Sequence, residues 1–122
     1  MKGTVFWANL DNEPHSHLRF VISNPAENGL CLAVHCCTKT GGRFDDLTCI
    51  LNEGDHRGIK HPSFIRYSNP IEISPEQIQQ KNRDRQLFLV EPMNNTTLLQ
   101  IQTGAKNSDD LPEKFEIYFE YF

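Results

Sequence analysis

The chain has 122 residues, of which 38% are hydrophobic and 10% aromatic, enough for one domain with a single core. Its formal net charge of -4 at pH 7 argues against a broad basic face for nucleic acid, although it permits a local basic cleft. The sequence contains no apolar run of the roughly 18 residues that cross a bilayer. The N-terminus MKGTVFWANL lacks the apolar region and cleavage site of a secretory signal, so we expect a cytoplasmic protein without membrane contact.

Two strand patterns occur near the N-terminus, on either side of a turn. Residues 3–10 (GTVFWANL) are rich in β-branched and aromatic side chains, and residues 11–14 (DNEP) have turn chemistry. Residues 17–23 (HLRFVIS) alternate in character, which predicts a strand with two different faces. One face carries Leu18, Phe20 and Ile22, and the other carries His17, Arg19 and Val21.

Three further strands are predicted in the middle of the chain. Residues 24–29 (NPAENG) end in Asn-Gly, which is a strong hairpin signal. The nearly continuous apolar run at residues 30–37 (LCLAVHCC) follows as a central strand, and residues 38–43 (TKTGGR) form a loop. Shorter strands are expected at residues 47–51 (LTCIL) and 63–67 (SFIRY).

The first helix signal lies just beyond these strands. Ser74, Pro75 and Gln77 combine an N-cap hydroxyl, a proline at the first helical position and the glutamine of a capping box. They predict a short polar helix over residues 75–83. Residues 87–90 (LFLV) are expected to be a short extended piece.

Two more helices are expected near the C-terminus. Asn95 or Thr96 caps a helix that runs through Thr103, with Gly104 as its left-handed stop. Ser108 or Asp109 caps the last helix, which leaves a broad apolar stripe that must lie on the sheet or on a partner. The stripe is Leu111, Phe115, Ile117, Tyr118, Phe119 and Phe122.

Several short strands followed by helices indicate an α+β fold. We expect a single domain over residues 1–122, without internal repeats or low-complexity segments. Within it, a small antiparallel β-barrel is expected over about residues 1–73, and helical additions over about residues 74–122.

The four cysteines, Cys31, Cys36, Cys37 and Cys49, fall in or beside apolar runs and form no CxxC motif. Buried free thiols in a reducing compartment are therefore expected. A zinc site built from His35, Cys36 and Cys49 is an alternative, but it lacks a standard ligand spacing. We expect no metal ligands and no cofactor.

Six short segments occur in the order of the motifs of a known toxin family. They are residues 3–7 (GTVFW), 17–23 (HLRFVIS), 33–38 (AVHCCT), 54–56 (GDH), 60–65 (KHPSFI) and 102–108 (QTGAKNS). In this order the chain resembles a divergent branch of the MazF/PemK (Kid-type) toxins of type II toxin–antitoxin systems. The resemblance covers about residues 3–68, and the tail only for that branch.

The resemblance to MazF/PemK toxins implies an SH3-like barrel that forms a homodimer and is restrained by a cognate antitoxin. It also implies cleavage of single-stranded RNA without a metal, by attack of a ribose 2′-OH on the adjacent phosphorus. This reaction needs a base for the 2′-OH proton, a cation for the charge on the phosphorane and an acid for the leaving oxygen.

Three residues are the catalytic candidates. The resemblance gives Arg19 the transition-state role, because a guanidinium can hold two phosphate oxygens; a surface salt bridge is the alternative. His17 lies on the same strand face and can act as base or acid at cellular pH, whereas a solvated loop histidine is the alternative for it and for His15. Thr38 matches the family's phosphate-binding threonine or serine, or else serves only as a strand-end turn residue.

The segment GDHRGIKHPSFI at residues 54–65 supplies most of the substrate-binding candidates. His56, Lys60 and His61 are expected to face the cleft and contact RNA, together with Lys39 of the preceding glycine loop. The five-residue separation of the two histidines suits neither a helical nor a strand pair of metal ligands.

Other residues of the same segment are expected to be structural. Asp55 can accept backbone amides across its own turn, Ile59 is expected to be buried, and Ser63 is assigned a structural role. A loop that only closes the barrel is therefore the alternative for the whole segment.

The chain departs from the toxin family at residues 68–71 (SNPI), where the family often carries an acidic residue. Either a histidine has taken over the acid–base duty, or the fold serves binding alone. The alternative function is a non-catalytic SH3-like interaction module whose aromatic C-terminal segment docks a partner, and a zinc-dependent enzyme ranks third.

Overall fold

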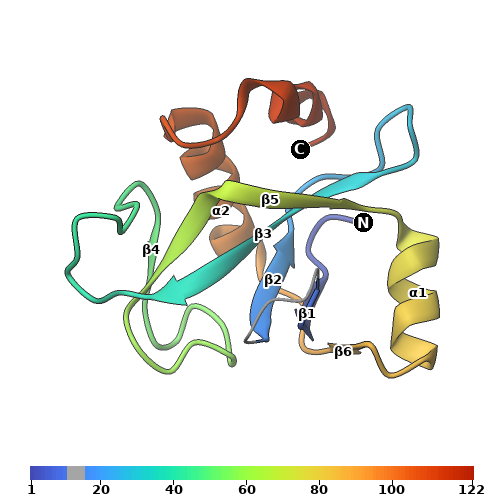
Figure 1. Ribbon diagram of the computed structural model, residues 1–122, viewed down its shortest axis with the longest axis horizontal. Coiled ribbons are helices and arrows are strands. Elements are labelled where there is room, and N and C mark those ends of the chain that lie inside the picture. Colours follow the sequence, from blue (N-terminus) through green and yellow to red (C-terminus); the bar gives the residue numbers. More distant parts are fainter. Residues whose placement is uncertain (11–15) are drawn as a thin grey trace.

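The computed structural model describes residues 1–10 and 16–122, and the fold is α+β: one antiparallel sheet with helical segments on both faces (Figure 1). The strands are β1 (Val5–Ala8), β2 (His17–Val21), β3 (Cys31–Thr38), β4 (Ile50–Leu51), β5 (Ser63–Ile73) and β6 (Leu87–Leu89). The helical segments are α1 (Pro75–Arg83), α2 (Asn95–Asn107) and the 3-10 helix η1 (Glu113–Tyr121). The turn predicted at residues 11–14 and the candidate His15 lie outside the described residues.

The six strands pair in the order β4-β5-β3-β2-β1-β6, each with an antiparallel neighbour. Over the described ranges this sheet is open, with β4 and β6 at its edges, so the predicted closure into an SH3-like barrel is not shown. The register between β3 and β5 shifts between Ala33 and His35. Such an irregularity bends a strand, and Figure 1 shows the bend in the middle of β5.

The two faces of β2 divide as the alternation predicted. Leu18, Phe20 and Ile22 belong to the main core, which α2 and η1 cover on one side of the sheet. The opposite face carries a smaller core around Phe6, Val21, Ala33 and Ile73, to which α1 contributes Ile78. In Figure 1, α2 lies behind β5 and α1 stands beside β6. The sheet thus separates the main core from the smaller core, and successive side chains along a strand point alternately to one side or the other.

The helix predicted over residues 75–83 is confirmed with its capping box. The Ser74 side chain accepts from the Gln77 amide at 3.0 Å, and the Gln77 side chain accepts from the Ser74 amide at 2.8 Å. The extended piece that follows is β6, which pairs with β1. The sheet therefore extends past residue 73, where the barrel was expected to end.

Gly104 does not stop α2, which continues to Asn107. A Cβ atom at this position would lie 2.3 Å from the hydroxyl oxygen of Tyr67 and 3.0 Å from the Cβ of Cys49. The Tyr67 hydroxyl donates to the backbone oxygen of Ile101 at 2.7 Å, which fixes the ring against the helix. Glycine is required here because α2 packs closely on β5, and the prediction of a helix-ending glycine was wrong.

We expect Gly104→Ala to destabilise the protein by about 1–3 kcal/mol, even though alanine favours helices by about 1 kcal/mol over glycine. Thermal unfolding should show a clear drop in melting temperature, whereas Thr103→Ala at the neighbouring exposed position should be nearly neutral. In a Tyr67→Phe background the alanine should cost less, since the obstructing hydroxyl is gone. A higher melting temperature for Gly104→Ala would contradict this account.

The last helical segment is a 3-10 helix without a side-chain cap, preceded by Pro112. The predicted cap at residues 108–109 was therefore wrong. Phe115 and Tyr118 are three residues apart, as the 3-10 repeat requires for one face, and both are buried in the main core. Ile117 points away and is 55% exposed. The apolar stripe therefore lies mainly on the protein's own sheet.

In the described portion of the chain, no helix combines the length and the apolar character needed to cross a bilayer.

Candidate functional site

A cleft of about 790 Å³ lies between the β2 and β3 ends and the loop that joins β4 to β5. The sheet contributes Trp7 from β1 together with the ends of β2 and β3, and the loop contributes residues 56–61. Val90 and Glu91, which follow β6, complete the wall. The segment with the predicted substrate-binding residues thus forms one side of a hollow, and the predicted strand ends form the other.

The loop is held in place by its own short contacts. The Asp55 carboxylate accepts from the Asn52 amide at 2.7 Å, and Gly54 supplies the positive φ of +102° that the turn needs. Ile59 is buried against the main core, and the Ser63 hydroxyl donates to the His61 backbone oxygen at 2.9 Å. The structural roles predicted for Asp55, Ile59 and Ser63 are confirmed.

His56 lines the cleft but is itself buried, with both ring nitrogens in use. Its Nδ1 accepts from the Gly58 amide at 2.9 Å, so its Nε2 carries the hydrogen and donates to the Glu91 backbone oxygen at 2.5 Å. The ring therefore ties the loop to the segment after β6. This geometry supports a positioning role for His56 in place of the predicted RNA contact.

Four of the predicted residues do meet around the cleft with exposed or half-buried side chains: His17, Thr38, Lys60 and His61. Sequence reasoning missed a fifth, the exposed Arg57, which lies between His56 and Gly58 in the same loop. Glu91 is the one carboxylate among the described lining residues. The cleft is therefore locally cationic on a protein whose net charge is negative.

Arg19 and Thr38 do not converge, contrary to the predicted catalytic arrangement. Arg19 is fully buried and lies opposite Phe6 and His35 in the neighbouring strands. Thr38 belongs to the other face of β3, where it lines the cleft. Arg19 is therefore not among the described residues that line the cleft.

Lys39 also lies apart from the lining residues. Its side chain is exposed, and its amide donates to the Pro62 backbone oxygen at 2.9 Å. That contact joins the end of β3 to the start of β5. Both Lys39 and Lys60 are thus exposed, but only Lys60 is among the described residues that line the cleft.

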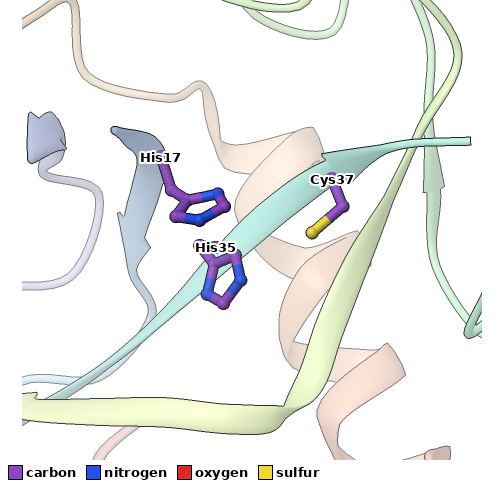
Figure 2. Close-up of side chains that lie close together, drawn as sticks. All are labelled: His17, His35 and Cys37. Carbon is purple, nitrogen blue, oxygen red and sulfur yellow. The ribbon is translucent and has the colours of Figure 1, made fainter. Parts of the chain in front are cut away.

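A second group of polar side chains lies on the strand face that carries Arg19: His17, His35 and Cys37 (Figure 2). Their ligating atoms all lie within 4.8 Å of one another, and the ring centroids of the two histidines are 4.4 Å apart. His35 is 2% exposed, and its Nδ1 has no hydrogen-bond partner among the described residues. The spacing of these three residues in the sequence does not predict that they lie together, because their proximity depends on the register between β2 and β3.

Burial lowers the pKa of His35 to about 3, and the positive charges of Arg19, His17 and Arg66 act in the same direction. Its imidazole is therefore neutral at physiological pH. A neutral imidazole offers a lone pair and does not add to the positive charge of the two arginines.

All four cysteines are free, as expected, but only Cys31 and Cys49 are buried, while Cys36 and Cys37 are half-buried. Cys36 and Cys49 belong to the main core, on the face opposite His35. Burial, followed by the neighbouring Cys37, raises the pKa of the Cys36 thiol to about 12. The alternative zinc site of His35, Cys36 and Cys49 is therefore ruled out by the alternation of β3.

Two exposed aromatic side chains lie side by side on β1 and β6, and one of them lines the cleft. Trp7 is 37% exposed and lines the cleft, and Phe88 is its direct partner in the pairing of β1 with β6, with 59% exposure. Paired residues on neighbouring strands project from the same face. Together they present flat apolar surface beside the cationic wall, a feature that the sequence pattern did not single out.

Comparison with known proteins identifies no family: no protein-family model and no curated protein matches the chain.

Proposed function

We propose that the chain binds single-stranded RNA in this cleft and cleaves it without a metal, by attack of a ribose 2′-OH on the adjacent phosphorus. The observation that carries the proposal is the set of groups around one hollow. His17 and His61 bring imidazoles, Thr38 a hydroxyl, and Arg57 and Lys60 positive charges. These are the types of group that the reaction requires.

In the proposed reaction, His17 takes the 2′-OH proton as the oxygen attacks phosphorus. Arg57 and Lys60 stabilise the charge on the phosphorane, and the Thr38 hydroxyl donates to a phosphate oxygen. The bond from phosphorus to the 5′-oxygen then breaks, and His61 gives a proton to that oxygen. The products are a 2′,3′-cyclic phosphate and a 5′-OH.

The aromatic margin supports a single-stranded substrate. Bases stack on exposed aromatic rings for about 1–3 kcal/mol each, and only unpaired bases present their faces. Trp7 lines the cleft together with these cations, and Phe88 is its partner in the pairing of β1 with β6. A duplex keeps the faces of its bases stacked inside the helix, where aromatic side chains cannot reach them.

The resemblance to MazF/PemK toxins adds partners and a setting to this proposal. That resemblance implies a cognate antitoxin that restrains the protein, a homodimer and an SH3-like barrel. Action in the cytoplasm is proposed from the N-terminus, which lacks the features of a secretory signal. The four free cysteines fit a reducing compartment.

The alternative, a non-catalytic module that docks a partner through its aromatic C-terminal segment, is less well supported. Phe115 and Tyr118 pack into the protein's own core, and of the stripe only Ile117 is largely exposed. Most of the surface on which that alternative depends is already covered.

The proposal is tested with purified protein and a mixed-sequence single-stranded RNA in EDTA. We expect cleavage to fragments with cyclic phosphate ends.

The exposed lysines Lys60 and Lys39 provide a matched pair for a binding measurement. Lys60→Ala should weaken RNA binding. It should also make the slope of the logarithm of the binding constant against the logarithm of salt concentration shallower by roughly 0.7, the contribution of one single-strand phosphate contact. Lys39→Ala should leave both unchanged. Intact RNA after incubation with the wild type, or equal effects of both lysine variants, would count against the cleft.

A further inference from the structure

The group of His17, His35 and Cys37 is built by strand pairing. Arg19 of β2 lies opposite His35 of β3, and the same antiparallel register continued by two residues sets His17 opposite Cys37. His35 and Cys37 are two apart on β3 and so share its face. Figure 2 shows the two rings next to each other, with the sulfur of Cys37 directed toward His35.

We propose that His17, His35 and Cys37 bind a zinc ion, with the fourth coordination position open toward the cleft. Two imidazoles and one thiolate are donors that zinc prefers, and three protein ligands with one open position are typical of accessible zinc sites. His17 and Cys37 both line the cleft, which places the open position on that side.

The distances suit this ion after small side-chain rotations. Zinc bonds of about 2.0–2.3 Å in a tetrahedron place neighbouring ligand atoms roughly 3.3–3.7 Å apart. The ligating atoms lie within 4.8 Å of one another, so any pair has to approach by at most about 1.5 Å. His17 and Cys37 are only half-buried and both line the cleft.

The condition of His35 is an independent observation in favour of a ligand. Its side chain is almost fully buried, and its Nδ1 has no hydrogen-bond partner in residues 1–10 and 16–122. Buried polar side-chain atoms are nearly always partnered, and exceptions call for an explanation such as a bound ion. A metal ion on this imidazole provides one.

The surrounding charges set the expected affinity. Arg19 and Arg66 lie opposite His35 in the two neighbouring strands and oppose a divalent cation. The Cys37 thiolate offsets one charge of the ion. We therefore expect a dissociation constant in the micromolar range, weaker than that of a closed four-ligand site. Zinc would also occupy His17 and suppress RNA cleavage, a consequence that rests on the proposed function.

The test uses the full chain, reduced and metal-free, without RNA. Zinc is titrated in competition with a chromogenic chelator, and cobalt is added separately to reveal thiolate ligation by its charge-transfer absorption. We expect one equivalent of zinc and a cobalt–thiolate band. Cys37→Ser should weaken binding at least about tenfold and remove the band. Cys36→Ser, next to it on the opposite face of β3, should retain both.

His17→Gln is the second ligand variant, and His61→Gln, on the loop side of the cleft, is its control. Loss of zinc affinity in His17→Gln with retention in His61→Gln supports the site. No saturable zinc binding by the wild type, or binding that survives both Cys37→Ser and His17→Gln, overturns it. Because no RNA is present, these outcomes do not depend on whether the protein cleaves RNA.

Discussion

Removal of residues 109–122 is expected to unfold the protein. Phe115 and Tyr118 are buried in the main core, and truncations of buried aromatic residues cost about 3–5 kcal/mol each. The deletion also removes the hydrogen bond from the Tyr118 hydroxyl to the Glu72 carboxylate and that from the Asn24 amide to the Tyr121 backbone oxygen. The summed loss is comparable to the roughly 5–15 kcal/mol that stabilises a whole domain.

Circular dichroism and thermal unfolding would check this expectation. The truncated chain should show no cooperative transition, and Phe115→Ala in the full chain should lower the melting temperature strongly. Ile117→Ala, on the exposed side of η1, is the matched control and should change stability by less than about 0.5 kcal/mol. The interaction-module alternative expects the opposite, namely a stable truncated protein that has lost only its partner.

The second large effect is expected at His17. His17→Gln should slow RNA cleavage by roughly 10²–10⁴-fold, the contribution of a general base, because the amide cannot take the 2′-OH proton. The side chain is half-buried at the start of β2, so the melting temperature should move by no more than about 4 °C. Single-turnover cleavage at saturating enzyme separates this loss of rate from any loss of binding.

Arg19→Ala provides the contrast. The side chain is fully buried, so its truncation should lower the free energy of unfolding by at least about 2 kcal/mol. Any loss of cleavage should then follow from a loss of folded protein. If Arg19→Ala instead kept its melting temperature and lost all cleavage, the role implied by the toxin resemblance would be right and the cleft proposed here would be wrong.

The elements whose signals are local were predictable from the sequence. The capping box at Ser74 and Gln77 is complete within four residues, and α1 begins where it predicts. The alternation of residues 17–23 reflects the two-residue period of any strand, and it placed Leu18 and Arg19 on opposite faces correctly. Asp55 closes its own turn over three residues, so its structural role was also accessible.

Signals that depend on a distant neighbour misled the prediction. A glycine at position 104, near the end of a helical pattern, is typical of a helix stop. The actual reason for the glycine is the Tyr67 hydroxyl, 37 positions earlier, which leaves no space for a side chain. The open sheet and the pairing of β6 with β1 depend on which edges meet in space, and strand patterns do not contain that information.

For the candidate site, the sequence by itself determined which residue types were present and how they alternate along each strand. Only the tertiary structure decided which face meets the loop: packing buried Arg19 and left Thr38, Lys60 and His61 around one cleft. It also brought His17 to His35 and Cys37. The physical reason is that period-two alternation fixes relative faces, whereas the choice between them depends on which apolar surface the helices and loops cover.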